Sequence, residues 1–243
     1  MKLYHGRILT VNKNDDVNNY LVEDKGRILF VGDAVPEQYK NAELVELGSK
    51  ALIPSFADTH QHLASFSAFH AGLNVMEAAS NAEILRMIEA FSRGAESKVL
   101  IAFGASPYSV AEGRLVSREE LDNVSFGKPL FLVKYDGHAC VVNTALLEKL
   151  PPKIKQLRGY HPDTGEMNQE AFFAVSDHIT NSLSIPELIA NMQKAVDYEA
   201  GRGIGMIHSV SGVGFALNLD ISMESWFARS LQSGFQLRIF PPS

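Results

Sequence analysis

Apolar residues in the first fifty positions form the short, dense runs of β-strands and show no helical period. The segments KLYHGRILTV (2–11) and NNYLVEDKGRILFVGDA (18–34) are rich in Val, Ile, Leu and Tyr, which favour strands. Gly26, in EDKGR, is typical of a hairpin turn that needs a positive φ. Two more short strands are expected around Gly48, in AELVELGSKALIPSFAD. The pattern therefore predicts a small β layer over residues 1–52.

Helical periodicity begins after residue 62. Ser80 and Glu83, in SNAE, have the spacing of a capping box. Apolar residues then recur at helical spacing: Ile84, Leu85, Ile88 and Phe91. Gly94 can end this helix. The segments SREE (117–120) and SIPE (184–187) repeat the capping pattern, and the helix after SIPE is expected to reach Gly201.

Strands and helices alternate toward the C-terminus. The runs VLIAF (99–103) and PLFLVK (129–134) predict short buried strands. IGMIHSV (204–210) predicts another strand, followed by a helix from about Asp220 to Ser233 and a strand in FQLRIF (235–240). Connections of this length between strands indicate parallel pairing with a right-handed crossover. The sequence stops soon after the last strand, so we expect an incomplete α/β barrel.

Composition and charge narrow the class of protein. The 243 residues are 46% apolar and 21% charged, and the net charge of −6 comes without a basic stripe. We therefore expect no nucleic-acid partner and no membrane partner. No apolar run reaches the roughly 18 residues that span a bilayer, and the N-terminus lacks the apolar core of a signal peptide. The single cysteine, Cys140, suits a reducing compartment, so a cytoplasmic location is expected.

The main candidate for chemistry is the tripeptide His60-Gln61-His62, at the end of ALIPSFADTHQHL. Alternate side chains of a strand point to the same face, so Asp58, His60 and His62 are expected to lie together. Two imidazoles on one face can share Zn, or Fe, Ni or Mn with added carboxylates. The competing interpretation is two polar histidines on a loop, because an H-x-H tripeptide arises easily by chance. The apolar strand before the pair favours the metal site.

Several motifs resemble those of the amidohydrolase superfamily. ALIPSFADTHQHL (51–63) is similar to its signature P-G-F-x-D-x-H-x-H-L, with Ser55 where glycine is usual. The segment REELDNVSFGKPLFLVKYDGHACVVNTALL (118–147) resembles the branch that carries a D-G-H-A-x-x-x-N insertion, which includes proteins similar to N-substituted formamide deformylases. GYHPDTGEMNQEA (159–171) resembles the G-x-x-x-D-x-x-T-G-x-x-x-E-A segment of that branch. The motifs follow the family order along essentially the whole chain.

The resemblance implies a metal-dependent hydrolase. Its metal pair falls on His60 and His62, with Zn as the first choice, in one or two ions. The metal would activate water to attack an amide-type, non-peptide C–N bond of a small-molecule substrate. A catalytic Zn has three or more protein ligands and one open position. The family's other ligands (a lysine or Glu, and two more His) and its Asp base are therefore expected beyond Ser243.

The resemblance also implies a substrate pocket. Its residues are Asp136, His138 and Asn143 from the D-G-H-A-x-x-x-N segment and Glu170 after T-G. His208, in the apolar strand MIHSV, is a further candidate for the pocket lining, on its position alone. The D-G-H turn and His208 have plainer alternatives, and for His208 the alternative is preferred. Asp and Gly can set a turn before the next helix, and a histidine in an apolar strand is commonly a hydrogen-bonded core residue.

Together these observations predict an α/β protein. A small N-terminal β-sandwich-like layer over residues 1–52 leads into the first three strands of a TIM-like (β/α) barrel over 53–243, with a large α/β insertion at about 70–184. The expected function is that of a hydrolase represented by its N-terminal half, so this chain alone is expected to be inactive. The alternative is a truncated or degenerate relative that acts as a non-catalytic structural fragment. Unpaired sheet edges favour a homo-oligomer in either case.

Overall fold

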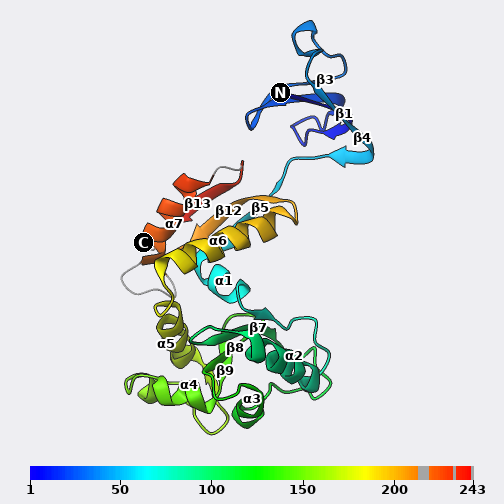
Figure 1. The fold of residues 1–243 in the computed structure, drawn as a ribbon. Helices are drawn as coiled ribbons and strands as arrows, with labels where there is room; N and C mark the ends of the chain where they lie inside the picture. Colours follow the sequence, from blue (N-terminus) through cyan, green and yellow to red (C-terminus); the bar gives the residue numbers. More distant parts are fainter. Residues whose placement is uncertain (213–218, 232–233, 242–243) are drawn as a thin grey trace.

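The computed structural model describes residues 1–212, 219–231 and 234–241, and these residues form three separate β-sheets (Figure 1). A four-stranded sheet lies at the N-terminal end of the molecule. A three-stranded sheet, whose strand β5 (Phe56–Gln61) carries His60, occupies the middle, and a six-stranded sheet lies at the far end (Figure 1). Within the described ranges, no helix is long and apolar enough to cross a membrane.

The N-terminal sheet has the order β3-β2-β1-β4 and includes a short 3-10 turn, η1 (Glu37–Tyr39), before its last strand. Its strands are β1 (Lys2–Leu9), β2 (Val17–Asp24), β3 (Arg27–Gly32) and β4 (Glu43–Leu52). The predicted hairpin is confirmed, with φ of +50° at Lys25 and +78° at Gly26. The prediction of two strands around Gly48 is wrong. With φ at +58°, Gly48 lies where the pairing register with β1 shifts, so it forms a bulge within one strand.

The middle sheet consists of three parallel strands in the order β13-β12-β5. They are β5 (Phe56–Gln61), β12 (Ile204–Val210) and β13 (Gln236–Phe240), and β12 has the predicted bounds. Three helices pack on one face of this sheet: α1 (Leu63–His70), α6 (Ile185–Ala200) and α7 (Leu219–Ser230). The helix predicted to reach Ser233 ends at Ser230, and Ser233 itself lies outside the described residues. The predicted parallel pairing is confirmed.

The insertion contains the six-stranded sheet, in the order β10-β11-β9-β8-β7-β6. Strands β6 to β8 pair in parallel, and β8 to β11 pair antiparallel. The strands are β6 (Leu73–Asn74), β7 (Leu100–Ala105), β8 (Leu130–Lys134), β9 (Ala139–Val142), β10 (Tyr160–His161) and β11 (Glu166–Asn168). The helices are α2 (Asn81–Gly94), α3 (Arg118–Val124), α4 (Thr144–Lys149), the 3-10 turn η2 (Ile154–Gln156) and α5 (Gln169–Thr180).

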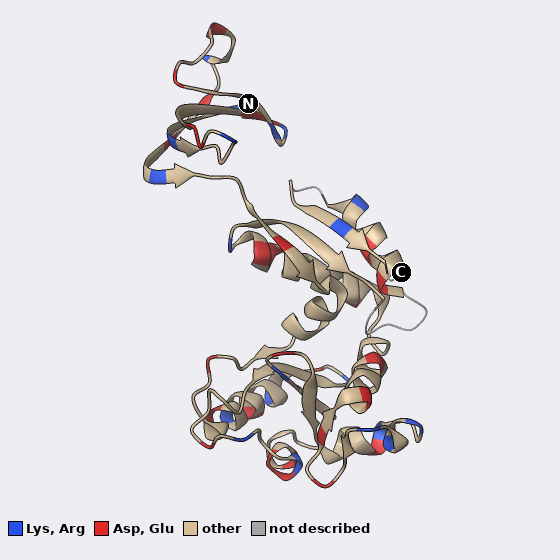
Figure 2. Ribbon diagram, turned by 180° about the vertical axis from the view of Figure 1, so that it is seen from behind, with Lys and Arg blue, Asp and Glu red and all other residues tan. Residues whose placement is uncertain are grey.

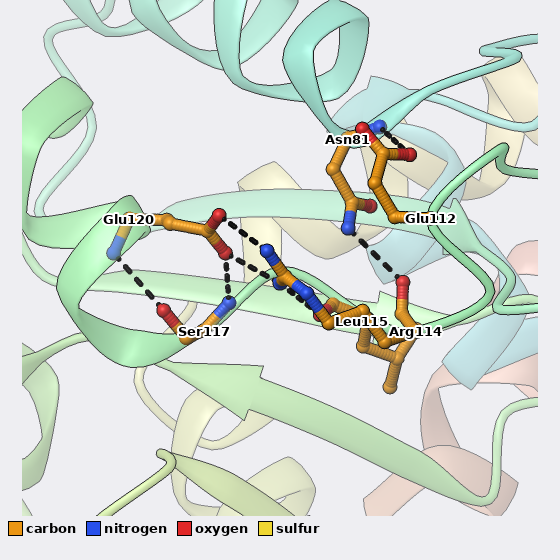
Figure 3. A network of polar contacts seen from close by, with 6 residues as sticks. All are labelled: Asn81, Glu112, Arg114, Leu115, Ser117 and Glu120. Carbon is orange, nitrogen blue, oxygen red and sulfur yellow. Dashed lines mark hydrogen bonds and ion pairs between the residues drawn. The ribbon is translucent and has the colours of Figure 1, made fainter.

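A polar network organises the loop before α3 (Figure 3). The predicted capping box is confirmed there: Ser117 Oγ accepts from the Glu120 N–H, and the Glu120 carboxylate accepts from the Ser117 N–H at 2.7 Å. Arg114 donates to both oxygens of this carboxylate, at 2.8 Å each. The Asn81 side chain donates to the Arg114 carbonyl, and the Asn81 N–H donates to Glu112. The starts of α2 and α3 are thereby tied together.

The other two predicted caps are also in place. At the start of α6 the Ser184 side chain accepts from the Glu187 N–H. Ser80 starts α2 by accepting from the Glu83 N–H at 3.2 Å, but the Glu83 carboxylate accepts from the N–H of Ala79 at 3.0 Å. In a standard capping box the glutamate would accept from the N–H of the N-cap residue itself, but here it accepts from the residue before it. The two hydrogen bonds still satisfy two donors near the start of α2.

The apolar cores show how each sheet is covered. Alternate residues of β8 enter two different cores, with Leu130 and Leu132 on the face of α2 and α3, and Phe131 and Val133 on the face of α4 and α5. A third core lies between the middle sheet and α1, α6 and α7. Figure 2 shows acidic residues on α6 and α7 beside a middle sheet with few charged positions. The insertion sheet is thus covered on both faces, and the middle sheet on one.

Candidate metal site

The histidine pair lies where β5 ends and α1 begins. His60 is exposed on β5, and His62 is the N-cap residue of α1. Both were expected on the strand, but the strand stops at Gln61. The two rings nevertheless lie together, with centroids 5.7 Å apart and planes at 88°. This edge-to-face approach brings the two imidazoles to one place at the C-terminal end of a parallel strand.

A backbone hydrogen bond determines which ring nitrogen of His62 carries the hydrogen. Its Nδ1 lies 2.6 Å from the carbonyl oxygen of Val210, at the end of β12. A carbonyl oxygen can only accept, so this contact assigns the hydrogen to Nδ1. The lone pair then remains on Nε2. Metal-binding histidines have this arrangement, with one nitrogen on the metal and the other N–H bonded to a carbonyl or carboxylate.

The neighbours of the pair support the strand rather than add ligands. Asp58 accepts from the His60 N–H at 3.0 Å, so its carboxylate is turned toward the backbone of β5. Gln61, between the two histidines, donates to Glu199 of α6 at 3.0 Å. Within residues 1–212, 219–231 and 234–241, no three His, Cys, Asp or Glu side chains form a group that could hold a metal. The two histidines therefore fit a metal as part of a ligand set.

The predicted pocket residues Asp136 and His138 form the turn between β8 and β9. The Asp136 carboxylate accepts from Lys134 Nζ at 2.9 Å and from the His138 N–H at 3.2 Å. The ring Nδ1 of His138 lies 2.6 Å from the Asp136 carbonyl oxygen, and Gly137 has a φ of +67°. Burial acts to raise the pKa of Asp136, but the bonds from Lys134 and His138 outweigh it and lower that pKa. These contacts are those of the turn alternative.

Asn143 holds the fold of the insertion. Its side chain is fully buried. The amide oxygen accepts from Leu130 N–H at 2.9 Å and Leu146 N–H at 3.0 Å, and the amide nitrogen donates to Ser125 Oγ and the Lys128 carbonyl. All four hydrogen-bonding positions of this amide are therefore used within the insertion.

The last two predicted pocket residues lie in different regions. Glu170 is in the first turn of α5, mostly exposed, and pairs with Arg158 at 3.5 Å. His208 is on β12, in the same sheet as the histidine pair, with its ring 5.1 Å from that of Phe240. Its Nε2 is buried and has no hydrogen-bond partner among the described residues. Of the five predicted pocket residues, only His208 shares a sheet with the pair.

A cleft in the insertion lies apart from the histidine pair, which is not among its lining residues. It has a volume of about 740 Å³ and lies between α3 and the β8–β9 region. Its lining includes Arg114, Glu120 and Lys134, and each of these charged groups already has an ion-pair partner. These ion pairs are closed within the insertion, and Glu119 and Glu166 add two further carboxylates to the cleft wall.

Sequence reasoning missed the residues that hold the pair in place. The contacts of His62 and of the start of α1 come from β12 and α7, about 150 positions further along the chain. The local signals are weak: two serines flank Val210, and Asp220 and Glu224 have i, i+4 spacing. Neither pattern indicates its distant partner.

A parallel sheet with helices on one face, and an imidazole pair where its first strand ends, define an α/β protein with a candidate metal site at the strand ends. The chain belongs to the amidohydrolase family, whose family model matches residues 43–220. The resemblance inferred from the motifs is thereby confirmed.

Curated relatives cover parts of this chain. The exoenzymes regulatory protein AepA of Pectobacterium carotovorum subsp. carotovorum is 30% identical over 151 residues, which are 59% of this chain and 32% of the relative. The N-substituted formamide deformylase of Arthrobacter pascens is 27% identical over 156 residues, 61% of this chain and 28% of the relative. The chain therefore matches only about a third of each relative's length.

Two solved structures have the same fold over almost the whole chain. They are uncharacterized metal-dependent hydrolases from Pyrococcus horikoshii OT3 and Pyrococcus furiosus, with TM-scores of 0.68 and 0.70 and 19% identity each. Each match covers 99% of this chain, but 48% and 50% of the solved chains. At this identity the likeness concerns the fold, and the chain spans about half the length of these structures.

Proposed function

We propose that this chain supplies the first metal-binding element of a metal-dependent hydrolase that acts on amide-type, non-peptide C–N bonds. The observation that carries the proposal is the histidine pair at the end of β5, with rings 5.7 Å apart. The hydrogen bond from His62 Nδ1 to Val210 leaves its Nε2 free to bind a metal. The name of the Arthrobacter relative, a formamide deformylase, supports the C–N bond, and the names of the Pyrococcus structures support the metal.

In this proposal His60 and His62 hold a divalent metal, with Zn as the first choice because neutral imidazole is a preferred Zn ligand. A metal of this kind, when bound, lowers the pKa of water toward about 7 and so provides a nucleophile at neutral pH. The protein residues keep one imidazole nitrogen of His62 protonated and its ring fixed. In this proposal the remaining ligands and the catalytic base come from outside the described residues, because no third ligand joins the pair within them.

The test is metal binding by the chain after chelator treatment. We expect calorimetric titration with Zn²⁺ to show one site that weakens at least tenfold in His60→Ala and in His62→Ala, because two ligands cannot be reduced to one without loss of affinity. His138→Ala is the matched control, since its ring hydrogen-bonds to its own turn and lies against Phe173 of α5, both in the insertion. Equal affinity in all four proteins would contradict the proposal.

A second candidate is a non-catalytic relative. It is favoured by the absence of a third ligand near the pair among the described residues. Both candidates predict that this chain alone does not hydrolyse N-formyl or N-acyl compounds. They differ over a longer protein: hydrolysis there that depends on Zn²⁺ and on His60 supports the enzyme, and metal binding without turnover supports the second candidate.

The finer architecture belongs to the same proposal. We propose that β5, β12 and β13 are the first strands of an incomplete (β/α) barrel over residues 53–243, with the insertion at about 70–184 and the N-terminal sheet as a separate layer of a sandwich. The edges at β5 and β13 then favour a homo-oligomer. Both this assembly and a cytoplasmic location remain predictions.

A further inference from the structure

Helix α1 begins without a capping side chain of its own. Ser, Thr, Asp or Asn usually occupies the N-cap position and accepts from the first free N–H groups of the helix. In α1 that position is His62, whose ring is turned to the carbonyl of Val210. The first two N–H groups find other acceptors: Leu63 donates to Ser209 Oγ, and Ala64 donates to Glu224 Oε1, each at 3.1 Å. The cap of α1 is therefore supplied from β12 and α7.

Glu224 is the centre of this arrangement. Its side chain, on α7, is 1% exposed. Besides the Ala64 N–H, its carboxylate accepts from Ser209 Oγ at 2.9 Å and from Ser211 Oγ at 2.7 Å. A carboxylate is also favoured near the positive end of a helix dipole. One buried side chain thus joins α7, the start of α1 and the end of β12.

The same carboxylate holds the residue that bonds the His62 ring. Val210 lies between Ser209 and Ser211, and both serine hydroxyls donate to Glu224. The backbone at Val210 is therefore fixed on both sides, at the point where its carbonyl accepts from His62 Nδ1. The position of the His62 ring and its Nδ1–H tautomer both depend on this anchored carbonyl.

We infer that Glu224 is a positioning residue for His62: it caps α1 from outside and fixes the Val210 carbonyl, so that the His62 ring is free to present Nε2. The inference deepens the proposed function and rests on it for the role of the metal. Glu224 itself contacts neither the metal nor the substrate in this assignment.

The experiment compares Glu224→Ala and Glu224→Gln with the unmodified chain. We expect ¹⁵N NMR of the metal-free chain to show His62 protonated at Nδ1, and Glu224→Ala to convert it to a mixture of both tautomers. Zn²⁺ affinity by titration is expected to fall about 10- to 100-fold in Glu224→Ala, as for other residues that orient a metal ligand. Glu224→Gln keeps an amide oxygen that can accept from Ala64 and Ser209, so it should retain the tautomer and most of the affinity.

Glu120→Ala is the matched control, because Glu120 also accepts at a helix start, but in the insertion. It should change neither the His62 tautomer nor Zn²⁺ affinity. An unchanged tautomer in Glu224→Ala, or the same loss in Glu120→Ala, overturns the inference. If Glu224→Ala does not fold, the tautomer in Glu224→Gln decides: the Nδ1–H form supports the inference, and a mixture overturns it. The tautomer needs no metal, so absent Zn²⁺ binding by the unmodified chain contradicts the proposed function alone.

Discussion

The six-stranded sheet of the insertion and the three-stranded sheet of the histidine pair differ in how much apolar surface this chain covers. On the insertion sheet, Phe131 and Leu132 are adjacent on β8 and are both buried, one in each core. On the middle sheet, Ile207 of β12 is buried against the helices, but Phe56 and Phe240 are 60% and 47% exposed. The candidate metal pair therefore lies on the sheet that is covered on one face, whereas the insertion sheet is covered on both, with Phe69 of α1 contributing to one of its cores.

This difference separates two kinds of motif. The D-G-H-A-x-x-x-N segment lies in the covered sheet, where Asp136 and His138 make a turn and Asn143 makes a cap. The H-x-H segment lies at the edge of the half-covered sheet, where the His62 ring is held through Nδ1 and no hydrogen bond from the described residues occupies Nε2. The turn and the cap use the Asp136 carboxylate and the Asn143 amide, whereas the H-x-H segment brings two imidazole rings together, as a shared metal requires.

The largest expected effect contrasts two phenylalanines. Phe131→Ala removes a fully buried side chain from the insertion core, and we expect it to lower the free energy of unfolding by about 3–5 kcal/mol. Phe56→Ala removes a side chain that is 60% exposed on β5, and it should cost less than about 1 kcal/mol. Urea unfolding, with amide hydrogen exchange on β8 and β12 to localise the change, measures both. Equal losses would mean that the middle sheet is covered in solution, as the predicted oligomer requires.

A smaller effect is expected from Asn143→Ala. It leaves the N–H groups of Leu130 and Leu146 without their buried acceptor, and each unsatisfied buried donor costs about 1–3 kcal/mol. We expect a loss of about 2–3 kcal/mol in urea unfolding, with Zn²⁺ affinity of the histidine pair unchanged. A drop in Zn²⁺ affinity without a loss of stability would contradict this structural role and would support a role for Asn143 in the substrate site.

Local chemistry explains why part of the fold could be predicted from sequence. A serine followed three residues later by glutamate satisfies helix donors within one turn, so the starts at Ser80, Ser117 and Ser184 could be located directly. The turn at Lys25 and Gly26 needs positive φ, which glycine provides. The closeness of the two H-x-H rings could be expected from spacing, because both belong to one segment, whereas the apolar strand before them favoured a metal site over two loop histidines.

Long-range contacts explain what could not be predicted. The segment LASFSAFH (63–70) is apolar nearly all round, since it packs between two sheets, and so it shows no amphipathic period although it forms α1. Its cap comes from Ser209 and Glu224, 146 and 160 positions away. The short antiparallel strand β9 also escaped prediction, because its four buried residues carry no alternation. For α1 the deciding partners are distant in sequence, whereas β9 pairs with the adjacent β8 as well as with β11.

The smallest expected effect uses the carboxylates that cap helices in the two regions. In the insertion, the hydrogen bond from Arg114, with help from Ser117, lowers the pKa of Glu120 from 4.5 to about 2. On α7, which packs on the middle sheet, burial raises the pKa of Glu224 above 4.5. The hydrogen bonds from Ser211, Ser209 and Ala64 act to lower this pKa, but burial outweighs them. The same role is therefore linked to opposite pH dependences, because one carboxylate has a cation beside it and the other does not.

The sign follows from which state binds the proton more tightly. For Glu120 the unfolded state does, so its contribution is complete above about pH 4.5 and is lost as pH falls toward 2. For Glu224 the folded state does, so stability is lost as pH rises from 4.5 through the raised pKa. We expect Glu120→Gln to differ from the unmodified chain by at most about 1 kcal/mol at pH 7, since this pair is partly exposed, and by less at pH 3. Above pH 4.5, Glu224→Gln should become more stable relative to the unmodified chain as pH rises, because its amide does not ionise. Urea unfolding between pH 3 and 7 measures both, with exposed Glu119→Gln as the control, and parallel curves for Glu120→Gln and Glu224→Gln would contradict the assigned environments.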